Sequence, residues 1–116
     1  MKTSLDPRHK KRQKIVKLLF AESFLKQSKS SKIGEILKNL TKIDKAISKI
    51  APSFPIEKIN KIDLAILRLA VFEILIEKKQ PPKVVVDEAI ELAKELAGEK
   101  SPAFINGALG KLLDKK

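Results

Sequence analysis

The segment from Ile62 to Ile76 constrains the fold of this chain more than any other part of the sequence. Its polar members are Asp63, Arg68 and Glu73, and their spacing of five residues places them on different sides of a helix. A helix that is apolar nearly all round lies buried among other helices. This segment is also too short and too interrupted to span a bilayer. The sequence therefore predicts one central helix in a globular protein.

The N-terminal part of the sequence predicts two amphipathic helices. Asp6-Pro7 is typical of a helix start, and the first helix is expected to reach about Lys26. A polar break follows at Gln27–Ser31, and one continuous helix is expected over residues 31–50, where apolar residues recur at spacings of three and four. The residues expected to face inward are Ile15, Val16, Leu18, Leu19, Phe20, Phe24, Ile33, Ile36, Leu37, Leu40, Ile43, Ile47 and Ile50.

The C-terminal part predicts a short turn and two more helices beside the central one. The run Ala51–Pro55 breaks the preceding helix and is the candidate boundary between two small subdomains, 1–52 and 53–116. A helical turn is expected over Ile56–Ile59, and a helix over Lys83–Ala97 with Gly98 as its C-terminal cap. Ser101-Pro102 is expected to open the last helix in the way that Asp6-Pro7 opens the first. The inward residues are Val85, Ala89, Leu92, Leu96, Ile105, Ala108, Leu109 and Leu112. The expected fold class is therefore all-α, a compact bundle of five or six helices.

Composition narrows the classes of function. The formal net charge is +11 among 116 residues, which favours a polyanionic partner such as nucleic acid, an acidic protein or an anionic membrane. Charge that serves only solubility is the alternative. The chain has no cysteine, which excludes disulfides, thiol catalysis and thiolate metal sites. The first residues lack an apolar signal core, so a cytoplasmic protein without a membrane segment is expected.

The strongest functional signal is the basic start of the first helix. Lys10, Lys14 and Lys17 share one ridge at helical spacing. Arg8 and Arg12 share another, which leads into the apolar side of the helix, so both arginines are expected where this helix meets the rest of the protein. Cations on a helix surface can neutralise successive phosphates of a nucleic acid. A solvated basic tail is the competing interpretation.

Catalytic and metal-binding signals are weak. His9 is the only histidine, and its position among cations predicts a solvated side chain whose charged form is disfavoured. No carboxylate pair or histidine spacing indicates a metal site, and no glycine-rich phosphate loop is present. We therefore expect a non-enzymatic protein that uses no cofactor and no metal.

Several single residues carry structural expectations. Arg68 is expected to be partly buried and paired with Glu73 or Glu88, because an unpaired buried guanidinium is costly. Asn106 and Gly107 are placed inside the last helix, with Gly107 allowing the close approach of another backbone and Asn106 making a fixed contact between helices. Phe104 is either an accessible stacking platform for RNA or an ordinary core residue.

Three motifs in the second half resemble the NusB family. The segment Ile62–Glu73 is similar to that family's central stretch, which reads hydrophobic-acidic-x-Ala-hydrophobic-Leu-Arg and ends in aromatic-Glu. Pro82–Lys94 resembles the following helix, and Phe104–Leu109 resembles the signature Phe-Val-Asn-Gly-Val-Leu. The three motifs occur in order and cover about residues 56–113, while Arg8–Phe24 resembles the family's first helix more loosely.

The resemblance implies a fold of two small helical subdomains and a non-catalytic role in transcription antitermination, notably in ribosomal RNA operons. NusB-like proteins pair with the small-subunit ribosomal protein NusE. The pair binds single-stranded boxA RNA within the transcription elongation complex. The family's basic N-terminus corresponds to Arg8, Lys10 and Arg12, its RNA-proximal last helix to Lys100, Ser101 and Phe104, and its acidic partner-binding position to Asp63.

Residues and resemblance together predict one binding set. The expected RNA-binding residues are Arg8, Lys10, Lys11, Arg12, Lys14, Lys100, Ser101 and Phe104, with Asp63 at the protein partner. The expected structural residues are Arg68, Glu73, Glu88, Asn106 and Gly107.

The sequence departs from the family pattern in its N-terminal half, which is short enough that one helix is expected to be lost or merged. Lysines also replace several arginines, which weakens bidentate phosphate recognition. The alternative function is an interaction or dimerisation module that binds a ribosomal protein without reading RNA. The sequence also allows the protein to form a homodimer. An anionic-membrane binder is disfavoured, because the lysine ridge carries no large apolar residues.

Overall fold

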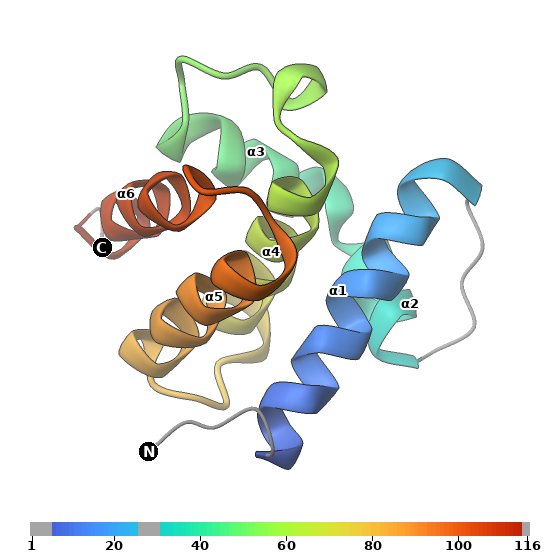
Figure 1. The fold of residues 1–116 in the computed structure, drawn as a ribbon. Helices are drawn as coiled ribbons and strands as arrows, with labels where there is room; N and C mark the ends of the chain where they lie inside the picture. The colour runs from blue at the N-terminus through green and yellow to red at the C-terminus, as the bar shows by residue number, and fades with distance from the viewer. Residues whose placement is uncertain (1–5, 26–30, 115–116) are drawn as a thin grey trace.

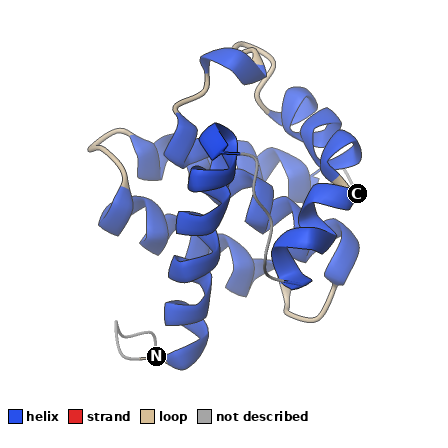
Figure 2. Cartoon of the chain, turned by 90° about the vertical axis from the view of Figure 1, so that its right-hand side faces the viewer, coloured by secondary structure: helices blue, strands red, loops and turns tan. Residues whose placement is uncertain are grey.

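The computed structural model describes residues 6–25 and 31–114, which form helices and connecting loops with no strand (Figures 1 and 2). This confirms the predicted all-α class. Phe24's side chain and residues 27–30 of the predicted polar break lie outside the described part. The elements are α1 (Pro7–Leu25), α2 (Ser31–Lys38), α3 (Leu40–Ile50), η1 (Ile56–Lys58), α4 (Lys61–Val71), η2 (Phe72–Glu77), α5 (Pro82–Leu96) and α6 (Ser101–Asp114).

The start of α1 follows the prediction. The Asp6 carboxylate accepts a hydrogen bond of 2.8 Å from the backbone N–H of Arg8, and Pro7 occupies the first helical position. An aspartate cap satisfies an N–H that the helix leaves unpaired. Ile15, Val16 and Leu19 are buried, but Leu18 and Phe20, which were expected inward, are exposed. The apolar arc of this helix is therefore wider than the surface it packs against.

Residues 31–50 form two helices, so the prediction of one continuous helix is wrong. The break is at Asn39, whose side-chain amide donates to the Glu35 carbonyl at 2.8 Å. Asparagine side chains compete in this way with the backbone bonds of a helix. The apolar stripe nevertheless crosses the break, since Ile36 of α2 and Ile43 of α3 are both fully buried. Periodicity alone therefore concealed the turn.

The central helix has a cap at its start and a wider helical turn at its end. Asn60 accepts hydrogen bonds from the backbone N–H groups of Ile62 at 2.8 Å and Asp63 at 3.4 Å, which caps α4. After Val71 the chain continues as the π-helix η2. It ends at Lys78, which has a left-handed backbone with φ 56° and is the only non-glycine residue with positive φ in the described part.

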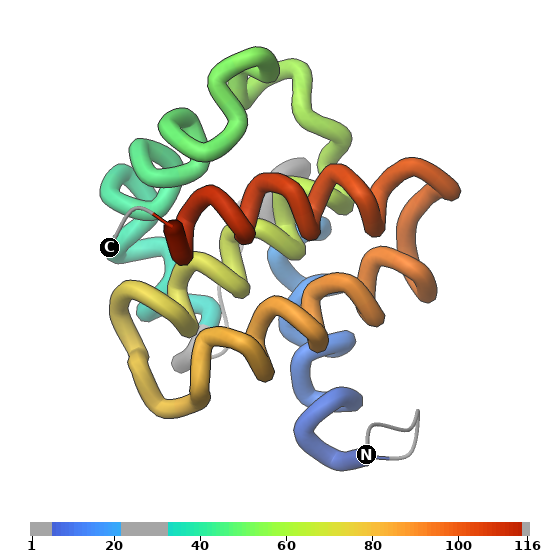
Figure 3. The backbone as a smooth tube through the Cα atoms, turned by 90° about the vertical axis from the view of Figure 1, so that its left-hand side faces the viewer, coloured from blue at the N-terminus to red at the C-terminus, as the bar shows by residue number. Residues whose placement is uncertain are grey.

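The last two helices form an antiparallel pair joined by a short turn (Figure 3). α5 ends at Leu96 and is followed by the extended residue Ala97, whose N–H donates to the Ala93 carbonyl at 3.0 Å. Gly98 was expected as the C-terminal cap of this helix, but the cap is Ala97, and the φ of Gly98 is not positive. α6 begins at Ser101 itself, one residue earlier than a Ser101 cap would place it.

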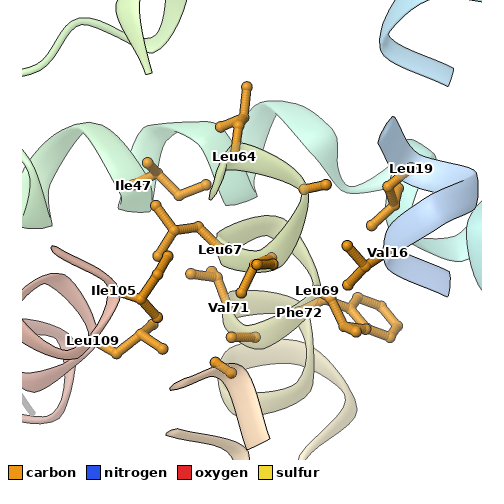
Figure 4. Close-up of a cluster of buried hydrophobic side chains, with 14 of the residues drawn as sticks. Val16, Leu19, Ile47, Leu64, Leu67, Leu69, Val71, Phe72, Ile105 and Leu109 are labelled. Carbon is orange, nitrogen blue, oxygen red and sulfur yellow. The ribbon is translucent and has the colours of Figure 1, made fainter. Parts of the chain in front are cut away.

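The core surrounds α4, as the sequence predicted. Figure 4 shows Leu67 of α4 pointing toward Ile47 of α3 and Ile105 of α6, while Val16 of α1 lies near Phe72. The four helices α1, α3, α5 and α6 all contact α4, and the buried apolar residues of both halves form one cluster. No described helix is long and apolar enough to cross a membrane.

Candidate nucleic-acid interface

The lysines of α1 form an exposed face on the first helix. Lys10, Lys14 and Lys17 are all exposed and lie on one side of α1, while Lys11 and Arg8 are exposed beside them. Arg8 lies 3.6 Å from the Asp6 carboxylate, with 73% of its side chain exposed. These cations therefore face solvent and are available to a polyanion. The lysines lie as the sequence predicted, but Arg8, which was expected where α1 meets the rest of the protein, is mostly exposed.

His9 lies on the opposite side of α1 and is buried, with 1% exposure. Its Nδ1 lies 2.6 Å from a carboxylate oxygen of Glu88, and its Nε2 lies 2.7 Å from one of Glu95. A ring with a carboxylate at each nitrogen is held as the imidazolium, which donates both bonds. Burial opposes that charge, but the hydrogen bonds to Glu88 and Glu95 outweigh it and raise the pKa of His9. The expectation of a solvated histidine with a disfavoured charge is wrong.

Arg12 is buried beside His9 and is fully engaged within the protein. Its Nε and Nη2 donate to the two carboxylate oxygens of Glu73, each at 2.9 Å, and its Nη1 lies 3.7 Å from Glu88. Burial again opposes the charge, and the hydrogen bonds and field of Glu73 raise the pKa of Arg12. The prediction that Arg12 sits where α1 meets the rest of the protein is correct. Its assignment to RNA is not supported, because the guanidinium faces inward.

Five charged groups thus alternate in one network, in the order Glu95, His9, Glu88, Arg12 and Glu73, of which only Glu95 is exposed. The network joins α1 to α5 and to η2, and it fixes how α1 is rotated about its own axis. The sequence did contain a signal for it. Residues 9, 12, 16 and 19 recur at helical spacing, so His9 and Arg12 continue the stripe of Val16 and Leu19.

Arg68 has a different partner from the one predicted. It is half-buried, as expected, but its Nε and Nη2 donate to the two carboxylate oxygens of Asp44 on α3, at 3.0 and 2.9 Å. The proposed pairing with Glu73 or Glu88 is wrong, because those carboxylates are taken by Arg12 and His9. A bidentate pair between α4 and α3 therefore replaces a pair within the C-terminal half.

A second group of predicted residues gathers where α6 begins. Asp63, Lys100, Ser101 and Phe104 line one cavity of about 300 Å³, together with Phe54 and the α4 cap. The rings of Phe54 and Phe104 meet edge to face, with centroids 5.3 Å apart and planes at 75°. Phe104 is only partly buried, so its ring packs against the core and also lines the cavity.

Asp63 is the buried carboxylate of this cavity. Burial raises its pKa, and a hydrogen bond from the Ser101 hydroxyl offsets the effect only in part. Its Oδ1 has no hydrogen-bond partner among the described residues. A buried polar atom without a partner is costly, and it is a natural acceptor for a donor that enters the cavity.

The expectations for the middle of α6 are not met. Asn106 and Gly107 are both exposed, and a methyl group added at Gly107 would meet nothing within 4 Å. Neither residue therefore makes the close interhelical contact that was predicted. Gly107 instead borders an apolar groove of about 210 Å³ between α6 and the loop after α3, next to the Phe54–Phe104 pair.

The two groups of predicted residues lie on adjoining elements. Gln13 of α1 donates a hydrogen bond of 2.9 Å to Glu95 near the end of α5, and α6 starts six residues further along the chain. The described residues contain no group of three or more His, Cys, Asp or Glu side chains placed to hold a metal ion. The arrangement thus consists of outward cations and a partly aromatic cavity, which are features of a binding surface.

Comparison with protein families decides the relationship. The NusB family model matches residues 10–114, nearly the whole described chain. The chain belongs to the NusB family. Transcription antitermination protein NusB of Clostridium botulinum (strain Loch Maree / Type A3) is 49% identical over 81 residues, which are 70% of this chain and 57% of that protein. NusB of Acetivibrio thermocellus is 44% identical over 81 residues, which cover 70% of this chain and 56% of that protein. The chain thus spans somewhat over half the length of these NusB relatives.

Solved NusB structures share the fold. NusB of T. maritima superposes with a TM-score of 0.82 at 32% identity, covering 99% of this chain and 94% of that one. A structure of the antitermination factors NusB and NusE in complex with double-stranded RNA superposes with a TM-score of 0.78 at 21% identity, covering 95% and 99% of the two chains. These comparisons establish the all-α NusB fold expected from the sequence motifs.

Proposed function

We propose that this chain is an RNA-binding transcription antitermination protein, which binds boxA-type single-stranded RNA together with NusE in the transcription elongation complex. The observation that carries the proposal is the lysine face of α1, which the charged network turns outward beside the α5–α6 turn. Membership of the NusB family supports the antitermination role. NusE enters the proposal through the solved complex that shares this fold. The proposal contains no catalytic step.

The RNA-binding residues follow from exposure. Arg8 and the lysines 10, 11 and 14 would contact phosphates, and Lys100 would continue the contacts at the start of α6. Ser101 is buried and its hydroxyl is bonded to Asp63, so it would meet RNA only inside the cavity. The partly exposed ring of Phe104 would stack with a base. Arg12 is left out, because its guanidinium is bound to Glu73.

Asp63 stays in the proposal with a changed role. The residue is only 7% exposed, so a partner must enter the cavity to reach its carboxylate. A base or a side chain carrying an N–H donor would pair with the unpartnered Oδ1. Direct contact with the face of NusE would need more exposed surface than Asp63 offers.

The decisive experiment compares two pairs of lysines by titration with boxA-type RNA. In the test variant Lys10→Gln and Lys14→Gln are combined, and in the control Lys45→Gln and Lys49→Gln are combined on α3. All four lysines are exposed and each pair is spaced by four residues. Roughly four to six phosphate contacts on a single strand give a log–log salt slope of about −3 to −4, and losing two contacts flattens it by about 1.4. The control pair should leave affinity and slope unchanged.

The competing function is a module that binds a ribosomal protein without reading RNA. It predicts that the Lys10/Lys14 variant keeps its RNA affinity and salt slope, which would overturn our proposal. A variant that loses RNA affinity while it still binds NusE would separate the RNA surface from the protein surface. Both titrations use the full chain, whose fold is checked by its helical circular dichroism spectrum.

A further inference from the structure

A basic groove lies on the side of α1 that faces the η2–α5 turn, away from the contact with the end of α5. Arg8 and Lys11 of α1 face Lys79 and Gln80 of the turn across a volume of about 200 Å³. No residue of the turn belongs to the RNA-binding set expected from the sequence.

Glu73 and Glu77 are the acidic residues that line the groove, and both act on the charge of Arg12. Glu73 is bound through both carboxylate oxygens by Arg12, at 2.9 Å each. The charge of Glu77 also acts on Arg12 and contributes to its raised pKa. By contrast, Lys11 and Lys79 are exposed and form no ion pair within the described part of the chain. The groove therefore presents cations and the amide of Gln80 to whatever enters it.

The backbone holds the turn in a fixed shape. Lys78 takes its left-handed conformation where η2 ends, and Pro81 and Pro82 follow within four residues. Two consecutive prolines restrict the chain strongly. Lys79 and Gln80 lie between these constraints and lose little backbone freedom when a ligand binds. A binding site whose backbone is already fixed binds more tightly, because less conformational entropy is lost when the ligand binds.

The groove is continuous with the lysine face of α1. Arg8, Lys11 and Lys14 follow one another at intervals of three residues, so they are neighbours in a row along the helix surface. The row runs from the groove, which Arg8 and Lys11 line, to the outward face that carries Lys14. A strand whose phosphates follow this row reaches the groove that Lys79 also lines.

We propose that the groove between α1 and the η2–α5 turn binds a backbone phosphate of single-stranded RNA. Lys79 would be an RNA contact outside the set expected from the sequence. The RNA footprint thus extends from the lysine face of α1 over the turn. This inference rests on the proposed RNA-binding function, but it concerns a different element of the fold.

The test is the variant Lys79→Gln, compared with Lys49→Gln on α3 as the matched loss of one exposed lysine. Both are titrated with a long boxA-type RNA and with a truncated one that covers only the lysine face of α1. For the long RNA we expect Lys79→Gln to lower affinity roughly fivefold and to flatten the salt slope by about 0.7, the value of one phosphate contact on a single strand. For the truncated RNA we expect it to match the unsubstituted protein.

The outcomes separate the two proposals. If Lys79→Gln binds the long RNA as the control does, while the Lys10/Lys14 variant loses binding, the groove is not an RNA site and the proposed function stands. If neither variant changes RNA binding, both proposals fail. If Lys79→Gln weakens NusE binding alone, the groove contacts protein and the inference is overturned.

Discussion

At the scale of single residues, two arginines with similar chemistry differ in how far they are withdrawn from water. Arg12 has a side chain 10% exposed against a Glu73 side chain 7% exposed, whereas the Arg68–Asp44 pair is 15% and 24% exposed. Removing one partner of a buried pair leaves the other charge desolvated and uncompensated. The more accessible pair is partly screened by water, so its loss costs less.

We therefore expect Arg12→Ala to lower the free energy of unfolding by about 3–5 kcal/mol. Arg68→Ala should cost distinctly less. Urea unfolding followed by circular dichroism measures both. A double variant with Arg12→Met and Glu73→Leu removes both charges and should recover much of the loss, since apolar residues often replace a buried pair without penalty. Equal unfolding midpoints for Arg12→Ala and the unsubstituted protein would contradict this account.

At the scale of elements, the end of η2 concentrates backbone strain in one residue. Lys78 has φ 56° and ψ 32°, and its N–H donates to the Glu73 carbonyl at 2.9 Å, a bond that closes the wide helical turn. A side chain makes the left-handed conformation unfavourable by about 1 kcal/mol, a cost that glycine does not have. The position nevertheless sets the direction of the following turn and hence of Lys79.

Lys78→Gly should therefore raise the free energy of unfolding by up to about 1 kcal/mol, even though glycine is usually destabilising in a folded chain. Lys79→Gly, at the neighbouring residue without positive φ, should lower it. Thermal unfolding of the two variants side by side gives the comparison. A loss of stability in both would show that the left-handed backbone of Lys78 carries no strain.

At the scale of the whole molecule, the charged network makes stability depend on pH. The pKa of His9 is raised above its ordinary value of 6.5, so its contribution is complete below that pH and is lost as pH rises through the folded pKa. The pKa of Glu95 is lowered from 4.5, where burial is outweighed by hydrogen bonds from His9 and Gln13. Its contribution is present above that value and is lost as pH falls through the folded pKa.

These two shifts predict highest stability between roughly pH 4.5 and 6.5, with a decline on the alkaline side that belongs to His9. Urea unfolding from pH 5 to 9 should show that decline in the unsubstituted protein. His9→Gln should be less stable at pH 5.5 and should lose the alkaline decline. If His9→Gln keeps the same decline, another group causes it.

The sequence by itself determined which segments are helical and which one is central. The segment 62–71 is apolar nearly all round, so only a position among other helices removes it from water, and the structure has that arrangement. Helical periodicity also identified the outward lysines of α1. Both conclusions depend on residues within about four positions of each other, because helix geometry places such residues side by side and so allows their arrangement to be predicted.

Only the tertiary structure decided the partners of the charged residues. His9 and Glu88 are 79 positions apart, Arg12 and Glu73 are 61 apart, and Arg68 and Asp44 are 24 apart. No local spacing relates such residues, because their distances depend on how the helices cross. Each carboxylate pairs with the cation that packing brings within hydrogen-bond distance, and burial then makes that pairing costly to break. The same packing turned Arg12 inward and left Lys11 and Lys79 facing one groove.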